Sequence, residues 1–264
     1  MSSGYPGRTA ERRSRALSIF PIHDGRALSH IERPYASWAL IALNVIVYFV
    51  VESGGLAKVS QASVLSFGLI PAVFNDYVVL PADLDIVSDQ LTLLTYAFLH
   101  GNLWHLIGNM IFLWVFADNV EDAFGHVRFV LFYVICAIAA GYAYVLTDPT
   151  SQAPVIGASG AVAGIVAAYL MLHPRQKVWI LALGRIPLRL SALWVLGFWI
   201  LFQFYAVLVA QPGDEVAWWS HIGGLAAGAV LTLVMRRRGV PLFDRAPPIP
   251  VPPAIDIDDR QGRR

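Results

Sequence analysis

The stretch GASGAVAGIVAAYLML, residues 157–172, places one serine among the smallest side chains, at the head of an apolar segment. Ser159 is flanked by Gly157, Ala158 and Gly160, and nothing in the apolar residues that follow favours a hydroxyl. Taken alone, a serine in a helix rich in glycine and alanine is usually a packing residue. The role of Ser159 therefore depends on which residues surround it.

The composition indicates a membrane protein. Of the 264 residues, 57% are hydrophobic and only 14% are charged, whereas soluble domains carry about 25% charged residues. The net charge of +1 gives no reason to expect a nucleic-acid partner. The single Cys136 excludes an intramolecular disulfide and a cysteine-based metal cluster.

Six apolar stretches are close to the ~20 residues that a helix needs to cross a hydrocarbon layer. Helices are expected because an open sheet leaves backbone groups unpaired in lipid. The sequence thus predicts an all-α polytopic membrane domain over residues 35–236, between an N-terminal segment (1–34) and a disordered, Pro-rich tail (237–264). The six predicted spans are residues 35–52, 99–117, 127–146, 155–172, 190–210 and 216–235.

The distribution of basic residues orients the six spans. If the N-terminus is cytoplasmic, Lys58 alone among the 19 lysines and arginines falls in an outer loop. Both termini are therefore predicted to be cytoplasmic, in a multi-pass protein of a bacterial inner membrane. The first 35 residues lack an apolar core, so no cleavable signal peptide is expected. The long connection 53–92 is expected at the outer interface, and residues 174–189 at the inner one.

Polar residues of three spans converge on one layer of the bilayer. The second, fourth and sixth spans all run from outside to inside, so their first residues share a depth in the outer leaflet. Ser159 begins the fourth span, His221 begins the sixth, and His100, His105 and Asn109 lie along the start of the second. Ionisable groups inside a membrane are costly and are candidates for function.

Helix periodicity brings Ser159 and His221 toward each other. Along the sixth span, His221, Gly224 and Gly228 share one face, which admits a close neighbour. The fourth span carries a stripe of small residues beside Ser159. If these two faces meet, the serine hydroxyl comes within hydrogen-bond reach of the imidazole.

That pairing has a chemical meaning. A serine becomes a nucleophile when a base takes its proton, and a neutral histidine can do so near neutral pH. Donors for the resulting oxyanion are available from the backbone N–H of Ser159 and the side chains of Asn109 and His105. No span places an acid beside His221, so a dyad rather than a triad is expected.

These motifs resemble the rhomboid family of intramembrane serine proteases. The resemblance rests on GASG at Ser159, SHIGGLAAG at His221 and HGNLWHLIGN, which contains His100, His105 and Asn109, and it covers about residues 35–235. It implies that Ser159 is the nucleophile and His221 the general base. It also implies an oxyanion hole and a set of structural residues near the site. The oxyanion hole comprises His105, Asn109, Ala158 and Ser159, and the structural residues are His100, Gly157, Gly160, Gly224 and Gly228.

The resemblance further implies transmembrane proteins as substrates, cut near the outer end of a helix, within the lipid bilayer and without a metal or cofactor. The sequence leaves the oligomeric state open. Two departures from the family pattern stand out. Leu91 and Thr92 replace a Trp-Arg pair of many members, and Ala163 replaces a tyrosine that stacks under the histidine in some members. They put in doubt the rigidity of the long loop and how His221 is held.

Other functions fit the pattern less well. A transporter is expected to carry polar groups through the bilayer or at its midplane, and a metal peptidase to carry a His-Glu-x-x-His helix. The main alternative is a catalytically weak rhomboid-like protein that binds membrane helices and escorts them. Relatives with that role lack the serine or the histidine, whereas this chain has both.

Overall fold

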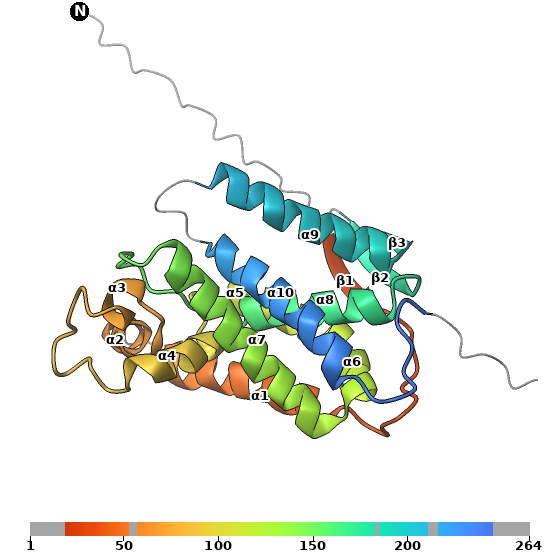
Figure 1. Ribbon diagram of the computed structural model, residues 1–264, viewed down its shortest axis with the longest axis horizontal. Helices are drawn as coiled ribbons and strands as arrows, with labels where there is room; N and C mark the ends of the chain where they lie inside the picture. The colour runs from red at the N-terminus through yellow and green to blue at the C-terminus, as the bar shows by residue number, and fades with distance from the viewer. Residues whose placement is uncertain (1–18, 53–56, 183–184, 211–215, 245–264) are drawn as a thin grey trace, which may run out of the picture.

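Helices dominate the fold, which is seen in a computed structural model that describes residues 19–52, 57–182, 185–210 and 216–244 (Figure 1). A π-helical turn, Tyr48–Glu52, extends α1, and a second one, Leu113–Ala117, joins α5 to α6. A 3-10 turn, Tyr96–Phe98, follows α4. The helices are α1 (Tyr35–Val47), α2 (Ala57–Phe67), α3 (Pro71–Phe74), α4 (Asp89–Thr95), α5 (Leu103–Phe112), α6 (Asp118–Phe124), α7 (His126–Thr147), α8 (Ser159–Leu172), α9 (Ala192–Val209) and α10 (Trp218–Met235).

In the described part of the chain, four helices are long and apolar enough to cross a membrane: Leu103–Phe124, His126–Thr147, Ala192–Val209 and Trp218–Met235. The other two predicted spans correspond to shorter apolar helices, Tyr35–Val51 and Ser159–Leu172. At 1.5 Å per residue, the 14 residues of α8 extend only ~21 Å. A bundle of six spans remains a prediction.

The short helix α8 lies at the centre of the bundle, packed against α7 and α10 (Figure 1). Every residue from Gly160 to Tyr169 is buried. Because protein surrounds α8, its length need not match the thickness of a lipid layer. The opposite case is α9, which lies at one side of the bundle and exposes large apolar side chains along its length, among them Trp194, Phe198 and Leu208.

A small sheet corrects the all-α prediction. Strands β1 (Ile19–His23), β2 (Lys177–Ala182) and β3 (Ile186–Ser191) form an antiparallel sheet in the order β1-β2-β3. Val178 and Ile180 are buried, whereas their neighbours in β2 point outward, as expected of a strand with one buried face. The predicted inner interfacial segment is thus largely a β-hairpin, and residues before the first span supply its third strand.

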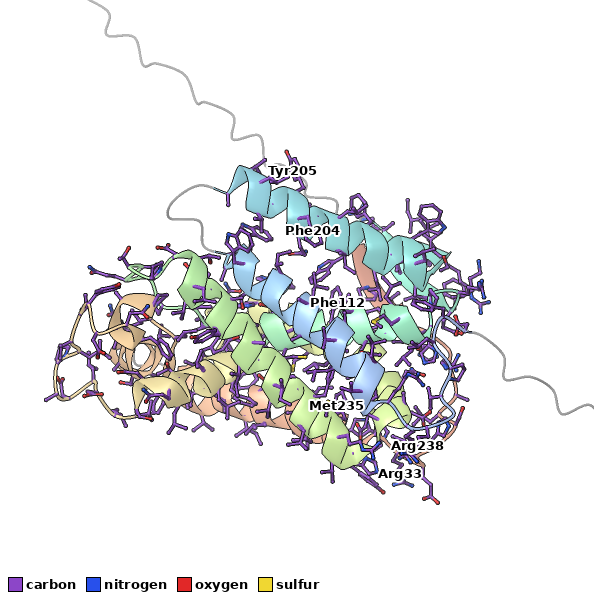
Figure 2. All side chains as sticks on the ribbon, in the orientation of Figure 1. Arg33, Phe112, Phe204, Tyr205, Met235 and Arg238 are labelled. Carbon is purple, nitrogen blue, oxygen red and sulfur yellow. The ribbon has the colours of Figure 1, made fainter. Side chains whose placement is uncertain are left out.

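The beginning of α1 is anchored to α6 by a buried carboxylate. Glu121 is fully buried and accepts hydrogen bonds from the backbone N–H of Ala36 (3.0 Å) and of Ser37 (2.7 Å). These N–H groups belong to the first turn of α1, where a helix has no partners of its own for them. The backbone N–H of Arg237, after α10, donates to Ala123 of α6 at 2.8 Å. Accordingly, Arg33 and Arg238 lie at the same end of the molecule (Figure 2). Phe204 and Tyr205 lie away from them, in the C-terminal half of α9.

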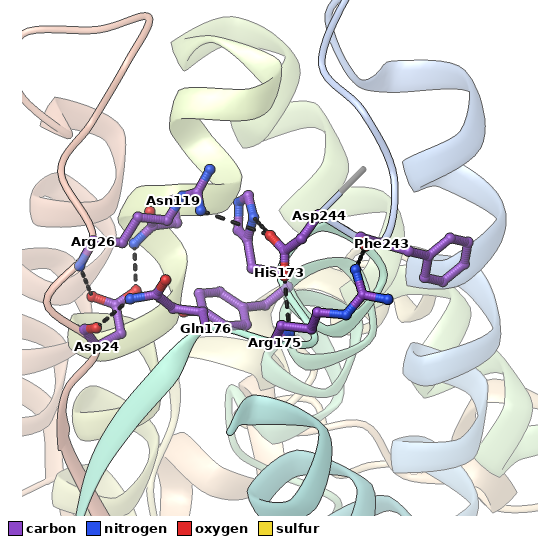
Figure 3. Close-up of polar contacts among 9 residues, drawn as sticks. Asp24, Arg26, Asn119, His173, Arg175, Gln176, Phe243 and Asp244 are labelled. Carbon is purple, nitrogen blue, oxygen red and sulfur yellow. Dashed lines mark hydrogen bonds and ion pairs between the residues drawn. The ribbon is translucent and has the colours of Figure 1, made fainter. Parts of the chain in front are cut away.

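The first residues of the predicted tail contact the end of α8. The backbone N–H of Phe243 donates to the carbonyl of Met171 at 2.7 Å. Asp244 accepts a hydrogen bond from the backbone N–H of Arg175 at 2.9 Å and lies 3.2 Å from Nδ1 of His173 (Figure 3). The last carbonyl groups of a helix have no partner within the helix. At the C-terminal end of α8, the backbone N–H groups of Phe243 and Asp244 donate to two of these carbonyls. The rest of the predicted tail, residues 245–264, lies outside the described residues.

A second polar group in the same region fixes β1. Asp24 is buried and accepts hydrogen bonds from the Asn119 amide at 2.8 Å and from the Tyr169 hydroxyl at 2.7 Å. Its backbone carbonyl accepts from the Gln176 side chain at 2.7 Å (Figure 3). The end of β1 is therefore tied to α6, to α8 and to the segment before β2.

Candidate active site

Ser159 stands at the first position of α8, at the end of a loop whose path is set by Gly157. Gly157 has φ +124°, a backbone conformation that side chains with a Cβ rarely adopt, and its N–H donates to the carbonyl of Tyr96 at 2.9 Å. A Cβ at this position would lie 2.6 Å from Nε2 of His105. Glycine therefore allows the loop to pass close to His105 without strain and to place Ser159 at the start of the helix.

The side chains of Ser159 and His221 meet across two helices. The Ser159 Oγ lies 2.8 Å from Nε2 of His221 on α10. Ser159 is half-buried, and His221 is 8% exposed. A proton can pass directly between the two atoms at this distance.

Close packing of α8 on α10 makes this contact possible. A Cβ on Gly224 would overlap the carbonyl oxygen of Gly160, and a Cβ on Gly228 would overlap that of Gly164. The two backbones are thus in direct contact over two turns, one turn below His221. This is the close approach that small residues allow between membrane helices.

The second ring nitrogen of His221 contacts a residue that the sequence analysis did not single out. Nδ1 lies 2.8 Å from Oε1 of Gln203, on α9. Gln203 is 2% exposed, and its Nε2 donates to the carbonyl of Trp199 at 3.1 Å. The indole rings of Trp199 and Trp218 lie 6.0 Å and 5.9 Å from the imidazole. An amide in the middle of an apolar span is costly in lipid, and this signal could have identified Gln203.

The two side chains of the predicted oxyanion hole, His105 and Asn109, lie on α5, next to the loop of Ser159, and Ala158 and Ser159 lie at the start of α8. The side chain of Asn102 caps α5 by accepting from the backbone N–H of His105 at 2.9 Å. His105 reaches Gly157, as described above, and Asn109 follows one turn later, buried, with Nδ2 donating to the carbonyl of His105 at 3.2 Å. The backbone N–H of Ser159 lies in the first turn of α8, where N–H groups have no partner within the helix.

His100 is buried beside this group. Its ring lies 5.1 Å from that of His105 in an edge-on arrangement. Among the described residues, no group of three or more His, Cys, Asp or Glu side chains could hold a metal ion. The arrangement brings a serine hydroxyl, an imidazole and hydrogen-bond donors together, a combination that suits acyl transfer.

The long first loop is held without the Trp-Arg pair. Leu69 and Val155 exchange backbone hydrogen bonds of 3.0 and 2.8 Å, which fasten the loop to the segment just before Ser159. The Thr95 hydroxyl donates to the carbonyl of Phe67 at 2.6 Å. Where the family pattern can carry a tyrosine, Ala163 is fully buried, and the rings beside His221 come from α9 and α10 instead.

The fold and the site define a helical membrane protein in which a serine and a histidine on neighbouring helices share a hydrogen bond. The family model for the rhomboid domain matches residues 88–238, which is more than half of the chain. The chain belongs to the rhomboid family.

Curated relatives show the same likeness over part of their length. The chain is 26% identical over 162 residues to the RHOMBOID-like protein 12, mitochondrial, of Arabidopsis thaliana, covering 55% of this chain and 46% of that protein. It is 28% identical over 153 residues to rhomboid protease GluP of Bacillus subtilis, covering 58% and 27%. It is 27% identical over 143 residues to the putative rhomboid protease YdcA of the same organism, covering 54% and 65%. The match thus spans about half the length, or less, of most of these relatives.

Proposed function

We propose that this chain is an intramembrane serine endopeptidase, with Ser159 as nucleophile and His221 as general base. The observation that carries the proposal is the 2.8 Å contact between Ser159 Oγ and His221 Nε2. Membership of a family with protease-named relatives supports the reaction type.

The proposed reaction has two halves. In the first, Nε2 of His221 accepts the hydroxyl proton as Ser159 Oγ attacks the scissile carbonyl carbon. His105, Asn109 and the backbone N–H groups of Ala158 and Ser159 stabilise the oxyanion. The imidazolium then gives its proton to the leaving amine, the peptide C–N bond breaks, and an acyl-enzyme forms. In the second half, His221 takes a proton from water, the hydroxide attacks the ester, and Ser159 regains its proton as the acid product leaves.

The proposed substrates are transmembrane proteins within the lipid bilayer. A helix protects its peptide bonds by hydrogen bonding, so the substrate must unwind locally to present a carbonyl to Ser159. Substrates with Gly or Pro near the outer end of the helix are expected, because these residues weaken helices. We further propose six spans, both termini in the cytoplasm, and a site in the outer leaflet of a bacterial inner membrane.

Labelling by a serine-directed fluorophosphonate tests the nucleophile. The purified full chain is compared with Ser159→Ala and His221→Ala, and with Ser88→Ala as a control, since Ser88 is an exposed serine whose side chain makes no capping hydrogen bond. Labelling is expected in the wild type and the control and is expected to be lost in the other two. Undiminished labelling of Ser159→Ala contradicts the proposal. A wild type that binds a membrane helix but is neither labelled nor active supports the escorting alternative.

A further inference from the structure

The amide of Gln203 has only one orientation that satisfies both of its neighbours. Nε2 donates to the carbonyl oxygen of Trp199 at 3.1 Å, and Oε1 lies 2.8 Å from Nδ1 of His221. If the amide were turned around, two oxygens would face each other at Trp199. Hydrogen-bond networks of this kind decide the orientation of an amide.

This orientation fixes the proton on the imidazole. Because Oε1 of Gln203 can only accept, Nδ1 of His221 must carry a hydrogen and donate it. In a neutral imidazole the other nitrogen then holds a lone pair. That nitrogen, Nε2, is the one 2.8 Å from Ser159 Oγ, so the ring is in the tautomer that can accept the serine proton.

We propose that Gln203 is a positioning residue that selects the Nδ1-protonated tautomer of His221 and holds its ring toward Ser159. The inference rests on the proposed function of His221 as the base. In serine triads an acid at this nitrogen sets the tautomer. A neutral amide sets the tautomer in the same way but brings no negative charge to the imidazolium.

Among the elements around His221, α9 supplies the group that orients the imidazole ring. Ala163 on α8 is too small to stack against the ring, and it is fully buried. Trp199, one turn before Gln203, lies beside the imidazole at an interplanar angle of 35°. Among the described residues, His105 on α5 is the titratable side chain of another helix whose charge acts on His221. The hydrogen bond to Nδ1 thus comes from α9, while the serine comes from α8.

Two substitutions at Gln203 separate positioning from packing. Gln203→Met has a similar length but no acceptor, and Gln203→Glu keeps an acceptor. Tyr205→Phe is the matched control, because it removes a polar group from an exposed side chain two residues along the same helix. Each variant is measured in the full chain for the rate of fluorophosphonate labelling, for kcat and KM on a transmembrane reporter, for the pH profile of kcat and for thermal stability.

We expect Gln203→Met to lower kcat and the labelling rate about 10- to 100-fold, because the productive tautomer of His221 loses the buried hydrogen bond that favours it, with KM close to wild type. Gln203→Glu is expected to recover most of the rate. Its acid limb should move to higher pH, because a carboxylate stabilises the protonated imidazole that cannot act as base. Tyr205→Phe is expected to match wild type.

The inference is overturned if Gln203→Met reacts at the wild-type rate, or if Gln203→Glu is no faster than Gln203→Met. Should Gln203→Met fail to fold, the pH profile of Gln203→Glu decides, and an unmoved acid limb counts against the inference. The Ser159→Ala variant separates the two proposals. Labelling that persists in Ser159→Ala removes the proposed function, whereas labelling lost there but unaffected at Gln203 removes this inference alone.

Discussion

Gly157 occupies a position where backbone conformation and a neighbouring side chain both disfavour any other residue. Its φ of +124° disfavours a Cβ, and His105 fills the space that a Cβ needs. Gly157→Ala is therefore expected to displace the loop that carries Ser159 and to reduce activity by about 100-fold or more, since small misplacements of reacting groups have effects of this size.

Gly239→Ala is a matched control for this prediction. Gly239 also has a positive φ, of +92°, but a Cβ there meets nothing within 4 Å. Both variants carry the same kind of backbone strain, of about 1–3 kcal/mol, and only Gly157→Ala adds a clash beside Ser159. Equal turnover of the two variants in a reporter-cleavage assay contradicts this account of the loop.

Asn109 provides a second test at the level of single residues. If its amide stabilises the oxyanion, Asn109→Ala should lower kcat by ~10² to 10³ and leave KM nearly unchanged, because the charge develops only in the transition state. Gln152→Ala, which removes an amide from an exposed loop residue, is expected to have no effect. A rise in KM with unchanged kcat is the result that rejects the assignment.

Single residues of this site differ in how far the sequence reveals them. Ser159 and His221 could be identified because both begin predicted spans that run in the same direction, so their predicted depths coincide. Gln203 could not be paired with His221 in this way. Its contact depends on the rotation of α9 about its own axis, and the apolar residues around the whole of that helix leave the rotation undefined.

At the scale of helices, the packing of α8 on α10 determines the distance between Ser159 and His221. Gly224→Ala or Gly228→Ala forces the two backbones apart, because the added Cβ meets a carbonyl group rather than a flexible side chain. Overpacking of this kind costs about 1–3 kcal/mol. We expect a lower Tm and reduced labelling of Ser159.

Gly197→Ala, on α9, is the control for these helix variants. A Cβ at Gly197 meets nothing within 4 Å, and alanine is the better helix former by about 0.5–1 kcal/mol. Its stability should match or exceed that of the wild type. If Gly224→Ala and Gly228→Ala behave like Gly197→Ala in thermal denaturation, the two helices are not packed as described.

The elements that the sequence predicted well are those with long apolar stretches, such as α7 and α10. The sheet was missed because β2 and β3 each have six residues, too few for alternation to stand out among apolar neighbours. The second helical span is longer than the sequence predicted, for another reason. A π-helical turn at residues 113–117 joins α5 to α6, so the helical segment ends at Phe124 and not at Ala117.

At the scale of the whole molecule, the end of α8 is held by residues from both ends of the chain. His173 follows α8 and faces Asp244 from the C-terminal segment, while Arg26 and Asp24 lie nearby after β1. Burial, together with the positive charge of Arg26, lowers the pKa of His173 below its usual 6.5, and outweighs the opposite effect of Asp244.

The lowered pKa predicts acid sensitivity. The folded chain favours neutral His173, so its contribution to stability is full above pH ~6.5 and is lost as the pH falls toward the lower pKa of the folded state. His173→Gln removes this titration. The Tm of the wild type should fall more steeply than that of the variant between pH 7 and 5, with exposed His23→Gln as the control. Parallel Tm curves for the wild type and His173→Gln are the contrary result.

The proposed activity requires Ser159 and His221 to act together on a peptide bond within the membrane. The most direct measurement is cleavage of a reporter, with a transmembrane helix weakened by Gly and Pro near its outer end, by the purified chain in liposomes. We predict that the wild type cuts within or beside the weakened segment, and that Ser159→Ala and His221→Ala, folded to the same Tm, do not. Continued cleavage by either of these variants would contradict the account.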